Sequence, residues 1–186
     1  MALLTDRLEL IPMSAAALDA LIDSDRPKLE AVTHAHFPDP LCAPPLMADA
    51  LTSMRKQVHA ENEDPRLGPW LAISRTTREA VGSVGLSGSA SDDGTLLVGY
   101  SIYPEFEGRG YATEATKALI AWALSLPRTR AIQATIPPWH IPSLRVAEKL
   151  GMRQVGTGHD DEVGEVLVFE FRPHDGSGHE TSHDCT

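Results

Sequence analysis

A glycine-containing turn is the strongest chemical signal in the sequence. Residues 107–113 read Glu-Gly-Arg-Gly-Tyr-Ala-Thr and lie between an apolar stretch and an amphipathic one. Gly108 and Gly110 would let successive backbone N–H groups converge, and the N-terminus of a following helix adds roughly half a positive charge. Such a turn binds an anion through the backbone, so the segment predicts a phosphate or diphosphate site that needs no lysine.

Two better-known phosphate loops do not fit this spacing. A dinucleotide-binding loop would have a third glycine where the sequence has Thr113, and it would follow the first strand of the fold. The chain contains no Gly-x-x-x-x-Gly-Lys-Ser/Thr run either. Taken alone, Gly-x-Gly is equally compatible with a flexible connection between a strand and a helix.

The pattern of apolar residues predicts the elements that would hold this turn. Short apolar runs predict strands at 8–12, 70–74, 81–86, 96–103, 131–136, 152–157 and 165–171. Helical spacing predicts helices that begin near Ser14, Pro27, Met47, Tyr111 and Ser143. Because one predicted helix lies between strands 96–103 and 131–136, we expect a parallel crossover in a mixed, mostly antiparallel sheet.

Composition and charge narrow the class of protein. The 186 residues are 42% hydrophobic and 23% charged, which suits one α/β domain. The net charge of −10 would repel a phosphate backbone, so no nucleic acid partner is expected; it would either attract a cationic partner or serve solubility alone. No apolar run reaches the roughly 18 residues of a membrane helix, and the N-terminus lacks a leader pattern. We therefore expect a cytoplasmic protein without membrane association.

The C-terminal residues and the cysteines add two further expectations. Residues 174–186 contain no large apolar side chain, and such a segment cannot offset its ordering entropy. We expect a folded domain over 1–173 and a disordered tail over 174–186. Cys42 and Cys185 are too few for a disulfide scaffold or a zinc site, so no metal is expected.

The order of the motifs resembles one enzyme superfamily. The run Glu107-Gly-Arg-Gly-Tyr-Ala112 resembles the Gln/Arg-x-x-Gly-x-Gly/Ala signature of the GNAT acyl-CoA N-acyltransferases. The run Ser143-Leu-Arg-Val-Ala-Glu-Lys-Leu-Gly-Met152 is similar to their second signature. The opening Thr5-Asp-Arg-Leu-Glu-Leu-Ile-Pro12 resembles the branch that contains the ribosomal-protein N-terminal acetyltransferases. The resemblance covers residues 5–172 in the correct order.

This resemblance implies a fold and a co-substrate. The fourth and fifth strands, here 96–103 and 131–136, would diverge into a V flanked by helices, with acetyl-CoA in the gap. An N–H near Ile102 would polarise the thioester carbonyl while an amine attacks directly, without a covalent enzyme intermediate. The implied cofactor-binding residues are Ile102, Tyr103, Glu107, Gly108, Arg109, Gly110, Tyr111, Ala112 and Thr113.

The sequence departs from the family pattern near the reacting groups. Glu107 stands where Gln or Arg is usual, and His140 where Asn is usual. Leu97 replaces a glutamate base that the branch often has, and Ala147 replaces a tyrosine that acts as a general acid in many members. Ser143 and His140 remain as catalytic candidates beside the sulfur. Ser143 is equally well explained as a helix N-cap, and His140 as a loop histidine.

The resemblance thus implies an N-acetyltransferase domain over 1–173 that moves an acetyl group from acetyl-CoA to a primary amine. The acceptor would be a protein N-terminus or a small-molecule amine, and a homodimer is common in such folds. The rival hypothesis, suggested by Leu97 and Ala147, is an acyl-CoA-binding module that has lost catalysis.

Overall fold

The computed structural model describes residues 1–44, 47, 51–59, 65–86 and 93–173 of the chain. The predicted tail, 174–186, and part of the helix predicted from Met47 lie outside the described residues. The helices that the structure describes are α1 (Ala15–Ile22), α2 (Arg26–Thr33), α4 (Leu51–His59), α5 (Tyr111–Leu124) and α6 (Ile141–Lys149), with short 3₁₀ turns η1 (Pro65–Leu67) and η2 (Pro104–Phe106). Among the described residues, no helix has the length and apolar character needed to cross a membrane.

The described strands form one mixed sheet. They are β1 (Leu3–Leu4), β2 (Leu8–Pro12), β3 (Pro69–Ser74), β4 (Ala80–Leu86), β5 (Thr95–Ile102), β6 (Ala131–Ile136), β7 (Arg153–Asp160) and β8 (Gly164–Phe171). Their order is β1-β2-β3-β4-β5-β6-β8-β7. Each neighbouring pair in this order is antiparallel except β5 and β6, which are parallel and are joined through α5. The predicted mixed α/β sheet with one parallel crossover is confirmed.

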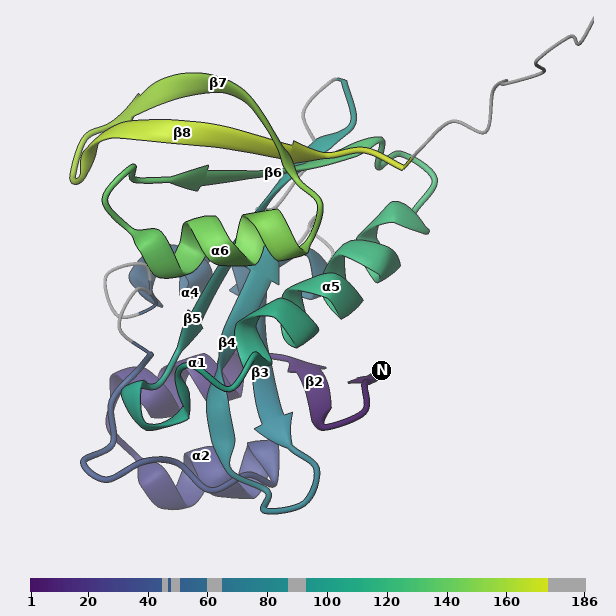
Figure 1. Cartoon of the computed structure of the whole chain (residues 1–186). Helices are drawn as coiled ribbons and strands as arrows, with labels where there is room; N and C mark the ends of the chain where they lie inside the picture. Colours follow the sequence, from purple (N-terminus) through teal and green to yellow (C-terminus); the bar gives the residue numbers. More distant parts are fainter. Residues whose placement is uncertain (45–46, 48–50, 60–64, 87–92, 174–186) are drawn as a thin grey trace, which may run out of the picture.

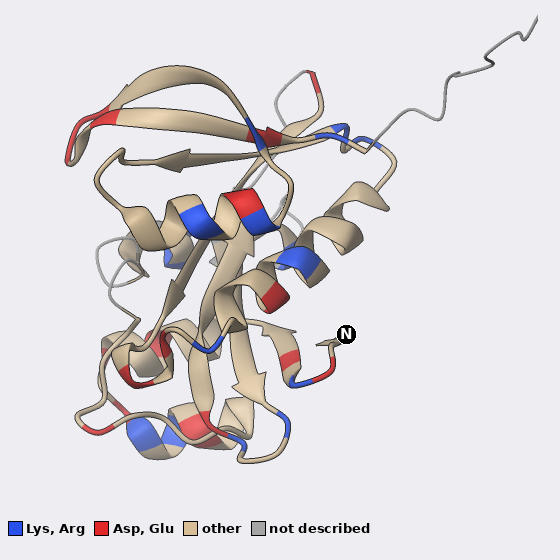
Figure 2. Ribbon diagram, viewed as in Figure 1, with Lys and Arg blue, Asp and Glu red and all other residues tan. Residues whose placement is uncertain are grey.

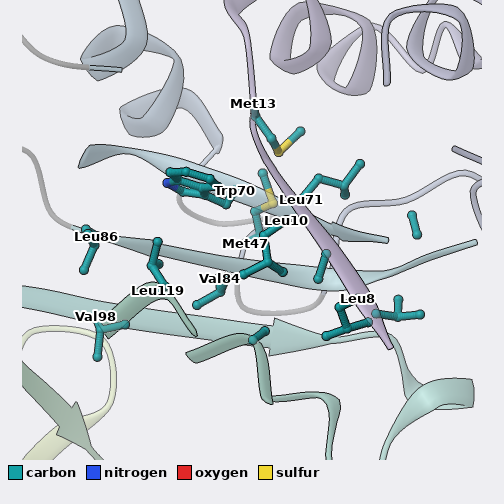
Figure 3. Close-up of a cluster of buried hydrophobic side chains, with 14 of the residues drawn as sticks. Leu8, Leu10, Met13, Met47, Trp70, Leu71, Val84, Leu86, Val98 and Leu119 are labelled. Atoms are coloured by element: carbon teal, nitrogen blue, oxygen red, sulfur yellow. The ribbon is translucent and has the colours of Figure 1, made fainter. Parts of the chain in front are cut away.

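Helices cover both faces of this sheet. In the view of Figure 1, α5 and α6 cross in front of the strands, and α1 and α4 lie behind them. Buried side chains of β2, β3, β4 and α5 form the core around Trp70 and Leu119, both fully buried (Figure 3). Burial of a leucine-sized side chain stabilises the folded state by about 1.5–3 kcal/mol, so this cluster fixes α5 against the sheet.

The strands β5 and β6 separate soon after they begin. They pair only at Thr95↔Ala131, Leu96↔Ile132 and Leu97↔Gln133. Beyond that point β5 continues beside β4 as far as Ile102, and β6 continues beside β8 as far as Ile136. Each strand therefore keeps an outer partner while the inner edges face a gap, and Figure 1 shows the two arrows diverging. This is the V that the family resemblance implied.

Candidate functional site

A cleft of about 510 Å³ opens where β5 and β6 diverge. Three segments line it: the end of β5, the turn that leads into α5 with the first residues of that helix, and one side of α6 from its N-cap to its last residue. The lining residues are Tyr100, Ser101, Ile102, Phe106, Glu107, Gly108, Gly110, Tyr111, Ala112, Thr113, His140, Pro142, Ser143, Arg145, Val146 and Lys149. Small-molecule sites usually measure about 300–1,000 Å³, so the cleft is large enough to be one.

The turn before α5 presents free backbone donors to this cleft. Gly108 and Gly110 have φ of +72° and +82°, in the left-handed region that glycine adopts without strain. Gly110 is the N-cap of α5 and has no side chain to bond the first-turn N–H groups. Within the described residues, the N–H groups of 108–113 donate no hydrogen bond. Such donors at a helix N-terminus bind anions, as the sequence predicts.

The run of free donors begins one residue later than predicted. The Glu107 N–H donates to the Pro104 carbonyl at 3.2 Å, which closes the turn η2. Glu107 still lines the cleft, with an exposed side chain that brings negative charge beside the free N–H groups. The Glu107 N–H thus already has an acceptor within the turn, and the role of Glu107 in binding the co-substrate stays a prediction.

Tyr103 and Arg109 do not line the cleft. The Tyr103 N–H donates to the Val81 carbonyl at 3.0 Å, and its hydroxyl donates to the Cys42 carbonyl at 2.7 Å. The ring is almost fully buried, and burial raises the pKa of the phenol. The Arg109 side chain is directed back along its own turn, where it donates to the Glu105 carbonyl at 2.8 Å. Both side chains thus serve the fold next to the cleft.

Backbone alternation directs the Ile102 N–H toward the gap. In an antiparallel ladder, successive residues present their N–H groups to opposite edges of the strand. Because the Tyr103 N–H faces β4, the N–H of Ile102 faces away from β4, toward the side where β6 has diverged. The Ile102 side chain also lines the cleft. This geometry supports the sequence-based role of an N–H near Ile102.

The start of α6 places His140 and Ser143 at the same cleft. The helix begins at Ile141, with His140 as its N-cap and Pro142 in its first turn. Proline is favoured there because its fixed φ suits a helix and its missing N–H is not needed. Ser143 therefore lies within the first turn, 9% exposed, and its alternative role as the N-cap is wrong. The His140 ring does not cap the helix and stands edge-on to Trp139.

Sequence reasoning missed four polar residues of this cleft, which are Tyr100, Ser101, Arg145 and Lys149. Tyr100 lies on β5, and its hydroxyl donates to the Ser143 carbonyl at 3.2 Å; burial raises the pKa of this phenol despite the hydrogen bond. Arg145 and Lys149 are exposed and stand four residues apart on α6, whose basic positions are blue in Figure 2. The four-residue spacing of two cations beside Ser143 was a signal that would have found them.

Of the four positions that depart from the family pattern, Leu97 and Ala147 lie outside the cleft lining. Leu97 is 44% exposed on β5, and Ala147 is 1% exposed inside α6, one turn after Ser143. Neither side chain can exchange a proton. In the described part of the chain, no three His, Cys, Asp or Glu side chains gather where they could hold a metal ion.

A family model and a related bacterial protein both identify the chain as similar to acetyltransferases. Residues 7–153 match the family model of the acetyltransferase (GNAT) domain. YjdG of Bacillus subtilis (strain 168), an uncharacterized N-acetyltransferase, is 26% identical over 150 residues, which are 79% of this chain and 86% of that protein.

Solved structures share the fold. The ribosomal-protein-S5-alanine acetyltransferase from Vibrio fischeri has a TM-score of 0.65 at 14% identity, covering 96% of this chain and 100% of that chain. RimL, a ribosomal L7/L12 alpha-N-protein acetyltransferase in complex with coenzyme A, has a TM-score of 0.64 at 14% identity, covering 92% and 98%. At such low identity the likeness concerns the architecture.

Proposed function

The chain belongs to the GNAT acetyltransferase family, and from this premise we propose that it transfers the acetyl group of acetyl-CoA directly to a primary amine. One observation carries the proposal. A single cleft holds the free N–H groups of the turn before α5 at one part of its wall, and Ser143 and His140 at another. An anion-binding turn beside proton-carrying groups suits a substrate with both a diphosphate and a reactive thioester.

The donors of the turn fit the diphosphate of acetyl-CoA, which supplies the activated acetyl thioester. The N–H groups of residues 108–113 and the positive end of α5 favour a negative ligand. Arg145 and Lys149 add two cations on the α6 side of the cleft. These cations counteract the carboxylate of Glu107, which replaces the Gln or Arg usual in the family.

The remaining polar groups fit the reacting end. The Ile102 N–H would donate to the thioester oxygen as negative charge develops there. His140 would accept the proton that the amine loses as its nitrogen bonds to the carbonyl carbon. Ser143 would donate a proton to the sulfur as the carbon–sulfur bond breaks and would regain one from solvent, while His140 releases the proton of the amine to solvent, so that free thiol leaves and no acyl-enzyme forms.

The second candidate function is an acyl-CoA-binding module without catalysis. Leu97 and Ala147 favour it, because each stands where related enzymes often carry a proton-transferring side chain. Both functions require acetyl-CoA binding, but only the first requires turnover. Within the first function, the acceptor is either a protein N-terminus or a small-molecule amine, and a panel of amines distinguishes the two.

Two measurements on the purified full chain test the proposal in sequence. Titration calorimetry with acetyl-CoA should show saturable binding; a flat titration would overturn both functions. Free-thiol release should then be followed with a panel of polyamines, aminoglycosides, amino acids and short N-terminal peptides, with an amine-free reaction as the control. Amine-dependent release supports transfer. Binding with no release for any amine class would favour the non-catalytic module.

A further inference from the structure

Arg7 contacts the turn before α5 from outside the cleft lining. Its Nη1 donates to the Arg109 carbonyl at 2.9 Å, and its Nε and Nη2 lie 2.6 Å from Oε2 of Glu114. The guanidinium carbon also stands 4.6 Å from the centre of the Tyr111 ring. Neither Arg7 nor Glu114 lines the cleft. One side chain from the segment before β2 thus binds the turn, the first residue of α5 and a carboxylate of the first helical turn.

The contact with the Arg109 carbonyl fixes the direction of a free donor. The carbonyl of Arg109 and the N–H of Gly110 belong to one planar trans peptide unit, in which the two groups point in opposite directions. Since Arg7 bonds the carbonyl, the Gly110 N–H points away from Arg7. Gly110 lines the cleft, so this orientation is the one that an anion in the cleft requires.

The contact with Glu114 removes a charge that would oppose the same anion. Glu114 is in the first turn of α5, next to the free N–H groups. Its Oε1 also accepts from the Thr5 hydroxyl at 2.6 Å and from the Arg7 N–H at 2.9 Å. An unpaired carboxylate there would compete for the positive helix end. Paired with Arg7, it is neutralised and held outside the cleft lining.

We propose that Arg7 is a positioning residue for the diphosphate site: it holds the Arg109–Gly110 peptide with its N–H toward the cleft, and it neutralises Glu114. The inference rests on the proposed function, because it assumes that the turn binds the diphosphate of acetyl-CoA. It gives the opening Thr5-Asp-Arg7 segment a role in binding a ligand that it does not touch.

The test compares Arg7→Met with Arg75→Met. Arg75 is a matched control because it donates to the Thr5 and Asp6 carbonyls, at 2.6 and 3.3 Å, and so tethers the same segment without touching the turn. Calorimetry should show acetyl-CoA binding about tenfold or more weaker in Arg7→Met, the size expected from losing charge-assisted hydrogen bonds, and within about twofold of the parent in Arg75→Met. S-acetylpantetheine, which lacks the diphosphate, should bind the parent and both variants with equal affinity.

The affinities of the parent and the variants decide whether Arg7 positions the diphosphate site. Arg7→Met binding acetyl-CoA as the parent does would overturn the inference, and so would an equal loss in Arg75→Met or an equal loss for S-acetylpantetheine. If Arg7→Met does not fold, Arg7→Lys replaces it: the charge is kept but the fork is lost, so intermediate affinity is expected and parent affinity would refute the orienting role. Failure of the parent to bind acetyl-CoA would instead refute the proposed function.

Discussion

At the scale of single residues, the proposed function assigns co-substrate binding and proton transfer to different groups of the cleft. The donors before α5 are backbone N–H groups, whose function survives most side-chain changes. Ser143 and His140 offer side-chain chemistry, and they lie at the start of one helix because Pro142 begins α6 at Ile141. Substitutions at these two positions should therefore change rates more than co-substrate affinity.

The first prediction concerns the hydroxyl of Ser143. Ser143→Ala should lower kcat by about ten- to a hundredfold, at or below the usual contribution of general acid–base catalysis, while acetyl-CoA affinity changes little. Steady-state kinetics and calorimetry on the same preparation measure both. Ser125→Ala is a suitable control, since that hydroxyl bonds the Trp122 carbonyl at the far end of α5. An unchanged kcat in Ser143→Ala would remove Ser143 from the mechanism.

The second prediction concerns the imidazole of His140. Asparagine is the usual residue here in the resembling family, so His140→Asn should retain activity. Because the imidazole is the proposed proton acceptor, its removal should change how the rate depends on pH. Rates measured from pH 6 to 9 for the parent and the variant check this. Superimposable profiles would show that His140 carries no proton.

The third prediction follows from the pairing of Glu114. Partial burial raises the pKa of this carboxyl, but hydrogen bonds from Thr5 and Arg7, together with the Arg7 charge, outweigh burial and leave it below the ordinary value of 4.5. A lowered folded-state pKa gives stability that is present above the unfolded pKa and is lost as pH falls through the folded one. Glu114→Gln should thus be less stable than the parent at neutral pH.

Denaturant unfolding of both proteins at several pH values measures this effect. The gap in unfolding free energy should narrow below pH 4.5 and close in stronger acid. A gap that stays constant over this range would mean that the Glu114 charge does not contribute to stability.

At the scale of elements, the start of α5 depends on a backbone shape that only glycine adopts easily. A Cβ added at Gly110 would lie 3.5 Å from Nη2 of Arg7, so a side chain there would point toward Arg7. Gly110→Asp would therefore act by straining a residue at φ of +82° and by competing with Glu114 for Arg7.

The fourth prediction is that Gly110→Asp loses most of its acetyl-CoA affinity. Gly151→Ala is the matched control, since Gly151 has φ of +72° after the end of α6 and does not line the cleft. Both variants should lose stability through the same left-handed strain, but only Gly110→Asp should lose affinity in calorimetry. Equal acetyl-CoA affinity in the two variants would show that the turn does not take part in co-substrate binding.

The same elements show what local sequence patterns can and cannot predict. Apolar runs predicted β3 to β6 and α5, because their buried faces repeat with the period of each structure. The bond of the Tyr103 N–H to the Val81 carbonyl was not predictable, because it depends on the register of β4 against β5. The contact between Arg7 and Glu114 joins residues 107 apart in sequence, and no local pattern encodes it.

At the scale of the whole molecule, a cleft lined by two cations and one carboxylate lies in a strongly acidic protein. The net charge of −10 favours a cationic acceptor by long-range attraction, while Arg145 and Lys149 keep the cleft suited to an anion. Under the proposed function, the divergence of β5 and β6 would make room for both substrates at one site. The family resemblance predicted this V, whereas the positions of the two cations required the structure.

The central claim is that the cleft transfers acetyl groups to amines. The most direct measurement follows free-thiol release from acetyl-CoA by the parent protein, with and without each amine class, and identifies the acetylated amine by mass spectrometry. The account predicts release that depends on the amine, matches the acetylated product in amount, and falls in both Ser143→Ala and Gly110→Asp. Thiol release that is the same without any amine, or that yields no acetylated amine, would contradict it.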